Sequence, residues 1–111
     1  MIEHYEFGKI VVNTQTYTTD IIILPNNQIL SWWRKSGHNV VNEDLEKIYK
    51  SKPEIIILGT GKYGIMKVSD EVYQYCRKHN IKLIAKDTQA AIEIFNNEKS
   101  TSKSAGFHLT C

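Results

Sequence analysis

The chain has 111 residues, 41% hydrophobic and 23% charged, which is ordinary for one soluble domain with a single modest core. No apolar run approaches about eighteen residues and the net charge is only +2, so we expect neither a membrane span, a secretory signal nor a nucleic-acid partner. The two cysteines, Cys76 and Cys111, lack metal-ligand spacing, and we therefore expect a cytoplasmic protein with free thiols, no metal and no cofactor.

The first third of the sequence is typical of antiparallel strands. Runs rich in β-branched residues cover Phe7–Val12 and Thr16–Leu24, and Asn13–Gln15 is a plausible hairpin connection between them. Turn residues at Pro25–Asn27 precede a third run over Gln28–Trp33. These patterns predict an antiparallel meander.

The remainder alternates between helices and strands. Capping residues predict helices that begin at Asn42, Ser69 and Thr88, and these helices are expected to end before Pro53, near Asn80 and near Lys99. Strands are expected at Ile55–Leu58, Ile81–Lys86 and Ala105–Thr110, with a mobile connection over Lys99–Ser104. Because such crossovers join parallel strands, the sequence predicts a single α/β domain over residues 1–111, a mixed sheet with N-terminal antiparallel strands and a C-terminal βαβαβ portion.

The apolar strand at Ile55–Leu58 runs directly into glycines with the spacing of a dinucleotide-binding turn, Gly59, Gly61 and Gly64. The next helix begins late, at Ser69, and fewer than about fifty residues follow the loop, too few for the second half of such a fold. A sharp turn that ends a central strand is the main alternative. A third is a small-anion site formed by Thr60, Lys62 and the loop N–H groups, since open α/β sheets place ligands at the carboxyl ends of their strands.

Ser31–His38, with the sequence SWWRKSGH, is the second unusual segment. Trp32 and Trp33 are expected on opposite faces, one in the core and one partly exposed. Beside Arg34 and Lys35 they favour an interface or a ligand wall, because aromatic residues and arginine dominate binding hot spots. His38 follows in a loop and is a candidate titrating group.

Histidine and cysteine near the carboxyl terminus are candidates for chemistry. His108 and Cys111 could form a thiol nucleophile and its base, but the terminal carboxylate disfavours a thiolate at the last residue of the sequence. Cys76 falls on the apolar face of its helix and is expected in the core. No catalytic residue is assigned, and whether the protein is an enzyme is left open.

Five motifs in order along the chain resemble one largely uncharacterised protein family, which includes the adipogenesis-associated domain protein, an archaeal founding member and a mitochondrial complex I assembly factor. The motifs lie within Tyr5–Ile10, Tyr17–Ile23, Trp32–His38, Leu58–Gly64 and Phe107–Cys111. The resemblance implies a mixed α/β single domain, no established catalytic mechanism, and an assembly or scaffolding role in its mitochondrial branch. Family members often have proline where Ser69 stands and a longer connection at Lys99–Ser104.

Two hypotheses on function follow. In the first, a non-enzymatic binding or assembly protein contacts a protein partner, or a second copy in a homodimer, through the Trp32–Lys35 surface and the Gly59–Gly64 loop. In the alternative, a small-molecule (anion) binding protein or enzyme has a pocket at the carboxyl end of the central strand. The candidate ligand-binding residues are Arg34, Lys35, His38, Gly59, Thr60, Gly61, Lys62, Gly64 and His108. Convergence of these residues on one concave pocket would favour the alternative.

Overall fold

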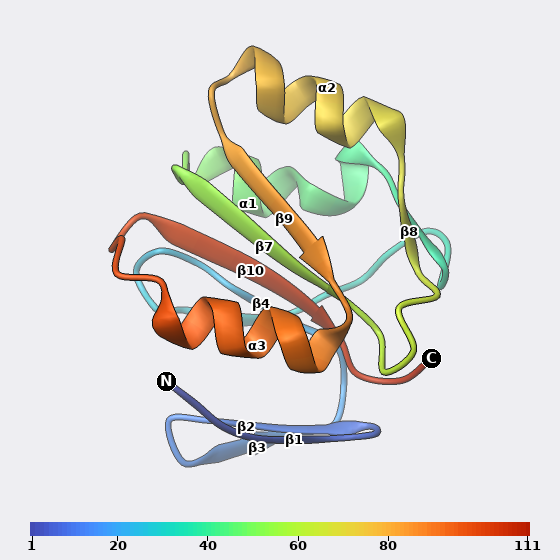
Figure 1. Cartoon of the computed structure of the whole chain (residues 1–111), viewed down its shortest axis with the longest axis vertical. Helices are drawn as coiled ribbons and strands as arrows, with labels where there is room; N and C mark the ends of the chain where they lie inside the picture. Colours follow the sequence, from blue (N-terminus) through green and yellow to red (C-terminus); the bar gives the residue numbers. More distant parts are fainter.

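A five-stranded mixed sheet forms the centre of the structure, a computed structural model that describes residues 1–111 (Figure 1). Its strands lie in the order β5-β4-β10-β7-β9, with β10, β7 and β9 parallel and β4 and β5 antiparallel to their neighbours. The bounds are β4 Ile21–Ile23, β5 Ile29–Ser31, β7 Ile55–Thr60, β9 Lys82–Lys86 and β10 Lys103–His108. The predicted α/β class, with antiparallel strands first and a parallel βαβαβ portion after them, is confirmed.

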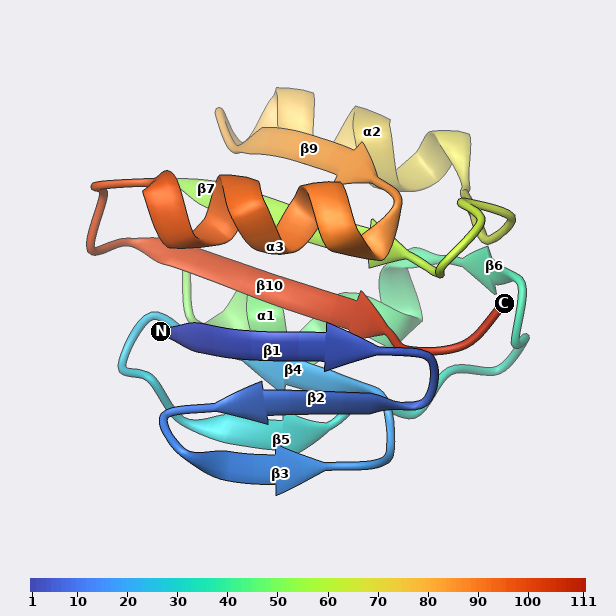
Figure 2. The same cartoon turned by 60° about the horizontal axis from the view of Figure 1, so that its bottom comes forward.

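A second, three-stranded antiparallel sheet precedes it, formed by β1 (Ile2–Glu6), β2 (Lys9–Val12) and β3 (Gln15–Tyr17) (Figure 2). The predicted hairpin is confirmed, because Asn13 and Thr14 form its turn with φ of 48° and 69°. Strand β1 was not predicted, since only one of its five residues is buried and its apolar alternation is weak.

The predicted strand over Thr16–Leu24 is wrong, because the run divides into β3 and β4, which belong to different sheets. Thr18, Thr19 and Asp20 link the two, although their β-branched neighbours give no sign of a break. The single meander is therefore replaced by a three-stranded sheet and an antiparallel pair at the edge of the central sheet.

Helices cover both faces of the central sheet. On one face lie the short helix η1 (Asn42–Leu45), α1 (Glu46–Lys50) and α2 (Asp70–Lys78). The other face is covered by α3 (Thr88–Asn97) together with the small sheet (Figures 1 and 2). A two-residue parallel pair, β6 (Asn39–Val40) and β8 (Lys67–Val68), was not predicted. None of the helices is long and apolar enough to cross a bilayer.

The helix starts differ from the predicted caps. Val41, not Asn42, stands before η1, and its N–H donates to Asp44 Oδ2 at 2.9 Å. Asp87, not Thr88, caps α3 by accepting the Ala90 N–H at 3.1 Å. Ser69 does precede α2, but its hydroxyl donates to Asn39 Oδ1 instead of capping the helix. The Ser69 side chain, which was expected to cap its own helix, therefore bonds to a residue distant in the sequence.

Strand β10 begins within the segment predicted as a mobile connection, so that prediction is wrong for Lys103 and Ser104. The strand lies between β4 and β7, and all its residues from Ser104 onward are buried. It ends at His108, two residues before the predicted end at Thr110. Cys76 lies in the core, as predicted.

Candidate functional site

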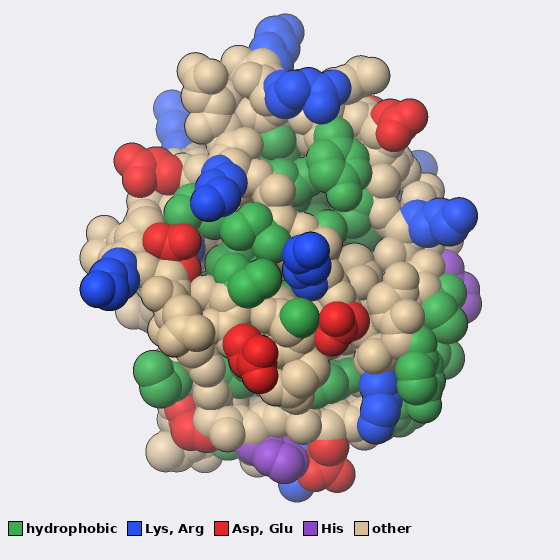
Figure 3. Space-filling model, viewed as in Figure 1, with side chains coloured by type: hydrophobic (Ala, Val, Ile, Leu, Met, Phe, Trp, Pro, Cys, Tyr) green, Lys and Arg blue, Asp and Glu red, His purple; other side chains and the backbone are tan.

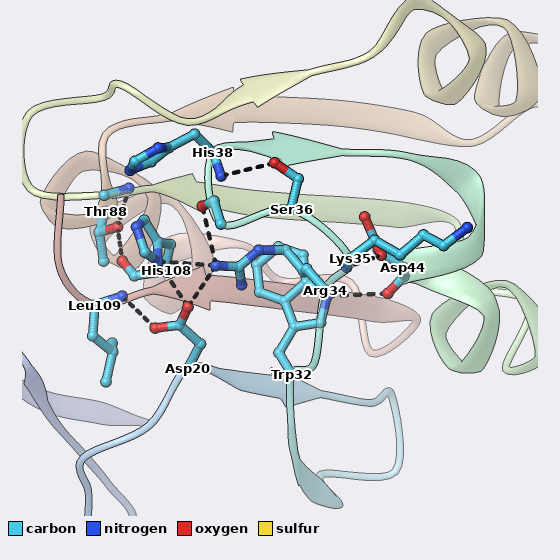
Figure 4. Close-up of polar contacts among 12 residues, drawn as sticks. Asp20, Trp32, Arg34, Lys35, Ser36, His38, Asp44, Thr88, His108 and Leu109 are labelled. Carbon is cyan, nitrogen blue, oxygen red and sulfur yellow. Dashed lines mark hydrogen bonds and ion pairs between the residues drawn. The ribbon is translucent and has the colours of Figure 1, made fainter.

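Three polar side chains from separate parts of the chain meet at the carboxyl end of β10 (Figure 4). Asp20 lies in the link before β4, Arg34 follows β5, and His108 ends β10. Asp20 Oδ2 lies 2.8 Å from Arg34 Nη2 and 2.7 Å from His108 Nδ1. The side chains of Arg34 and His108 are only 6% and 8% exposed, so this is a buried ionic cluster.

Asp20 holds the cluster together. Its second oxygen, Oδ1, accepts the Leu109 N–H at 2.8 Å, which ties the link before β4 to the end of β10. Burial alone raises the pKa of the Asp20 carboxyl, but hydrogen bonds from His108, the Leu109 N–H and Arg34 outweigh burial and hold this pKa below its usual value. Asp20 is therefore ionised at neutral pH.

An ionised carboxylate only accepts hydrogen bonds, so His108 Nδ1 carries the proton that it shares with Asp20. Arg34 Nη2 lies 3.2 Å from the same Nδ1, and both nitrogens donate to the one carboxylate oxygen. Three buried nitrogens have no partner, namely Nε and Nη1 of Arg34 and Nε2 of His108. Orphaned groups of this kind are uncommon in folded proteins and ask for an explanation.

Trp32 supports the cluster through its indole ring. The Arg34 guanidinium carbon lies 4.5 Å from the centre of this ring, and the indole N–H donates to the Asp44 carbonyl at 3.0 Å. Asp44 Oδ1 also accepts the Lys35 N–H at 3.1 Å, which fixes the backbone of this segment. Trp32 is buried and Trp33 is 75% exposed, so the predicted division between the two tryptophans is confirmed.

The glycine loop is a turn that directs its donors inward. The Gly61 N–H donates to Thr88 Oγ1 at 2.9 Å, the Lys62 N–H to the Thr110 carbonyl at 2.9 Å, and the Gly64 N–H to the Gly61 carbonyl at 3.2 Å. Gly61 and Gly64 have φ of +101° and +68°, where other residues are strained. These three N–H groups are therefore engaged, and an anion would have to displace a protein acceptor to reach them.

The structure brings together only part of the predicted site. Arg34 and His108 are in contact, and Gly61 lies against the His108 ring. Lys35 is exposed and pairs with Glu43 at 3.2 Å, while the Thr60 hydroxyl donates to the Lys86 carbonyl at 3.0 Å. Lys62 and His38 are exposed. No surface depression is lined by Arg34 or His108, so no common pocket joins these residues.

Asp20 is the member of the cluster that site prediction missed. Two signals mark it in the sequence: it is an acidic residue directly before the apolar run Ile21–Ile23, and it lies in the Tyr17–Ile23 motif of the family resemblance. Such a residue is poorly suited to a strand, which marks it as a place where the chain either turns or uses the carboxylate.

The lowered pKa of Asp20 gives an expected pH dependence. A carboxyl whose pKa is lower in the folded state stabilises the fold above its unfolded value, 3.8, and this contribution is lost as the pH falls through the lower folded value. The difference in the free energy of unfolding between the wild type and Asp20→Asn should therefore shrink from about pH 5 to about pH 2.5. Urea titrations at both pH values measure it, and a constant difference would contradict the assignment.

The comparisons with known proteins agree with this fold. The model of a family described as "Protein of unknown function (DUF498/DUF598)" matches residues 2–109. The crystal structure of the conserved hypothetical protein PH1505 from Pyrococcus horikoshii has a TM-score of 0.90 at 24% identity, covering 100% of this chain and 99% of that one. A solved structure named MT938 has a TM-score of 0.83 at 26% identity, covering 100% and 98%.

A Bordetella pertussis protein described as a Mth938-like domain has a solution structure with a TM-score of 0.67 at 16% identity, covering 97% of this chain and 84% of that one. No curated protein matches. The family match covers nearly the whole chain and agrees with the resemblance predicted from the motifs. The chain therefore belongs to the DUF498/DUF598 family of proteins of unknown function.

Proposed function

We propose that this is a non-enzymatic binding or assembly protein, which contacts a partner protein through Trp33 and the groove beside it. The groove has a volume of about 320 Å³ and lies between the β4–β5 edge of the sheet and the η1–α1 segment. It is lined by Ile22, Ser31, Trp32, Trp33, Glu43, Asp44, Glu46, Lys47 and Lys50. The observation that carries the proposal is Trp33, a large aromatic side chain that is 75% exposed at the rim.

Two features support a protein partner. Aromatic side chains at the centre of an interface contribute most of its binding free energy. Strand β5 is an edge strand, so one side of its backbone is unpaired and can accept an added strand of a partner. The charges at the rim are already matched, because Lys35 pairs with Glu43 and Lys50 with Glu46. We therefore expect the partner to insert an apolar side chain rather than a charged one.

The glycine loop supplies the second part of the proposed recognition surface. Tyr63 and Ile65 are 67% and 52% exposed on it. In Figure 3, hydrophobic side chains reach the surface at the right-hand edge of the molecule, where Figure 1 places the loop between β7 and β8. An aromatic and an aliphatic side chain held out by a rigid turn suit a contact with another protein.

Trp33→Ala tests the proposal. Truncation of a hot-spot residue costs about 2 kcal/mol or more, so the affinity for the partner should fall by about 30-fold. The measurement is quantitative recovery of bound proteins from the source cells, followed by titration of the purified partner. Phe7→Ala is the matched control, because Phe7 is also exposed (50%) but lies on the β1–β2 turn. Equal loss with both variants, or with neither, would refute the role of Trp33.

A second copy of the chain is one such partner, because an edge strand beside an exposed tryptophan can pair with itself. Sedimentation equilibrium of the wild type and Trp33→Ala distinguishes the cases, since only a homodimer would dissociate on substitution. Cys76 and Cys111 are both free thiols, which supports a reducing compartment such as the cytoplasm as the place of action.

A further inference from the structure

The Asp20–Arg34–His108 cluster is largely buried, with the Asp20 side chain 17% exposed, and it holds nitrogen atoms without partners. His108 Nε2 is one of them, and the side chain is 8% exposed. Unlike the two orphaned nitrogens of Arg34, which belong to a group stacked on Trp32, Nε2 has no compensating contact. A buried polar atom that lacks a hydrogen bond raises the free energy of the folded state.

The charge of the cluster depends on this one nitrogen. With His108 neutral, the charges of Asp20 and Arg34 cancel, and Nδ1–H donates to the carboxylate. With His108 protonated, Nε2–H becomes a buried charged donor without an acceptor. The imidazolium then also lies 3.2 Å from Arg34 Nη2, and both cations share the one oxygen Oδ2 of Asp20. A buried charge without its own partner destabilises the arrangement that encloses it.

The glycine loop covers one side of the His108 imidazole. Gly61 lies over the ring, so close that a Cβ at this position would be 3.0 Å from His108 Cδ2 and 2.7 Å from the Thr110 carbonyl oxygen. The glycine loop is joined to the end of the chain by the Lys62 N–H bond to Thr110 and to α3 by the Gly61–Thr88 pair of bonds. Because Cδ2 is bonded to Nε2, movement of Gly61 away from the ring exposes this side of the buried imidazole.

We propose that Asp20, Arg34 and His108 form a proton-sensitive junction, in which protonation of His108 separates the loop of residues 61–64 from the segment of residues 110–111. At neutral pH the junction holds both segments closed. In acid, the imidazolium gains hydration by opening them. The loop that opens carries Tyr63 of the proposed recognition surface, but the opening itself requires no partner and is tested on the protein alone.

Other charged or titratable groups surround the cluster from each packed element. From β1, Tyr5 donates its hydroxyl to the Leu109 carbonyl at 3.0 Å, and burial raises the pKa of this phenol, so it remains neutral in acid. Asp87, before α3, approaches the loop at Gly64, and Lys62 stands on the loop itself. The Cys111 backbone is adjacent to Gly61. In the closed state Asp20, 2.7 Å from Nδ1, favours the imidazolium, whereas Arg34, 3.2 Å from the same nitrogen, opposes it. Asp87 favours the imidazolium once the cover opens.

Amide hydrogen exchange at about pH 7.5 and about pH 5.5 tests the junction. If opening takes up one proton, the open population rises about tenfold for each pH unit below the midpoint. After correction for the intrinsic effect of pH on exchange, the hydrogen-bonded amides of Gly61, Lys62 and Gly64 should lose protection in acid, while those of β7 keep it. His108→Gln, which cannot be charged, should abolish this pH dependence, and His38→Gln, at an exposed histidine, should retain it.

If His108→Gln does not fold, measurements on the wild type alone still test the proposal. Loop protection that is equal at both pH values overturns the proposal, as does an unchanged pH dependence in a folded His108→Gln. The ¹⁵N shifts of the histidine rings supply the second measurement. They must show His108 at about pH 7.5 with the proton on Nδ1 and a lone pair on Nε2, and the opposite tautomer would also overturn it.

Discussion

Asp20→Asn should lower the free energy of unfolding by about 3–5 kcal/mol at neutral pH. The amide keeps the shape of the side chain but removes the only negative charge that faces Arg34 and His108. A guanidinium that is 6% exposed would then be buried without a counter-charge, which costs far more than the loss of one hydrogen bond. The Leu109 N–H would also lose its charged acceptor.

Urea denaturation followed by tryptophan fluorescence measures this loss. Glu43→Gln is the matched control, because Glu43 pairs with Lys35 at the surface, where the two side chains are 55% and 64% exposed. An exposed pair of this kind is worth less than about 1 kcal/mol. Equal, small effects of the two substitutions would show that the buried cluster does not depend on its carboxylate.

Gly59→Ala should destabilise the fold by about 1–3 kcal/mol or more, because no space exists for a methyl group. A Cβ on Gly59 would lie 2.9 Å from both Phe107 Cδ1 and Thr88 Oγ1, and 3.1 Å from Thr88 Cα. Neither neighbour can retreat, because Phe107 is fully buried in β10 and Thr88 begins α3. Thermal and urea denaturation both report the change.

The same substitution separates two interpretations of the glycine motif. If Gly59 only made room for a pyrophosphate, alanine would leave the stability of the free protein unchanged. If Gly59 allows α3 and β10 to pack closely, alanine destabilises the free protein. Gly37→Ala is the control, since nothing lies within 4 Å of a Cβ at that position and the expected change is within about 0.5 kcal/mol. Similar stability of the two variants would contradict close packing at Gly59.

Sequence patterns predicted the elements whose periodicity is strong. The apolar run of β7, the helix α2 and the division between Trp32 and Trp33 all follow from local rules of burial and periodicity. The patterns failed where tertiary structure overrides a local preference. The run from Thr16 to Leu24 is favourable for a strand at every residue except Asp20, yet the chain must pass from one sheet to the other within it.

The ionic cluster could not be predicted for a related reason. His108 and Asp20 are 88 positions apart, and nothing local to either residue indicates the other. The late start of α2 weakened the dinucleotide interpretation, but the use of the loop N–H groups by Thr88, Thr110 and Gly61 is visible only in the folded chain. Whether the loop or the Trp33 surface binds a ligand or partner stays a prediction.

The position of β10 determines when this protein can fold. The strand lies between β4 and β7, so these two strands have no common partner until residues 103–108 have been synthesised. The Ser104 hydroxyl donates to the Ile23 carbonyl, which lies 81 positions earlier in the sequence. The Leu109 N–H donates to Asp20, which lies 89 positions earlier. During translation the edges of β4 and β7 that pair with β10 therefore stay open while the rest of the sheet is made. Pairings this distant in sequence also form slowly, which prolongs the time in which these edges are open to non-native pairing.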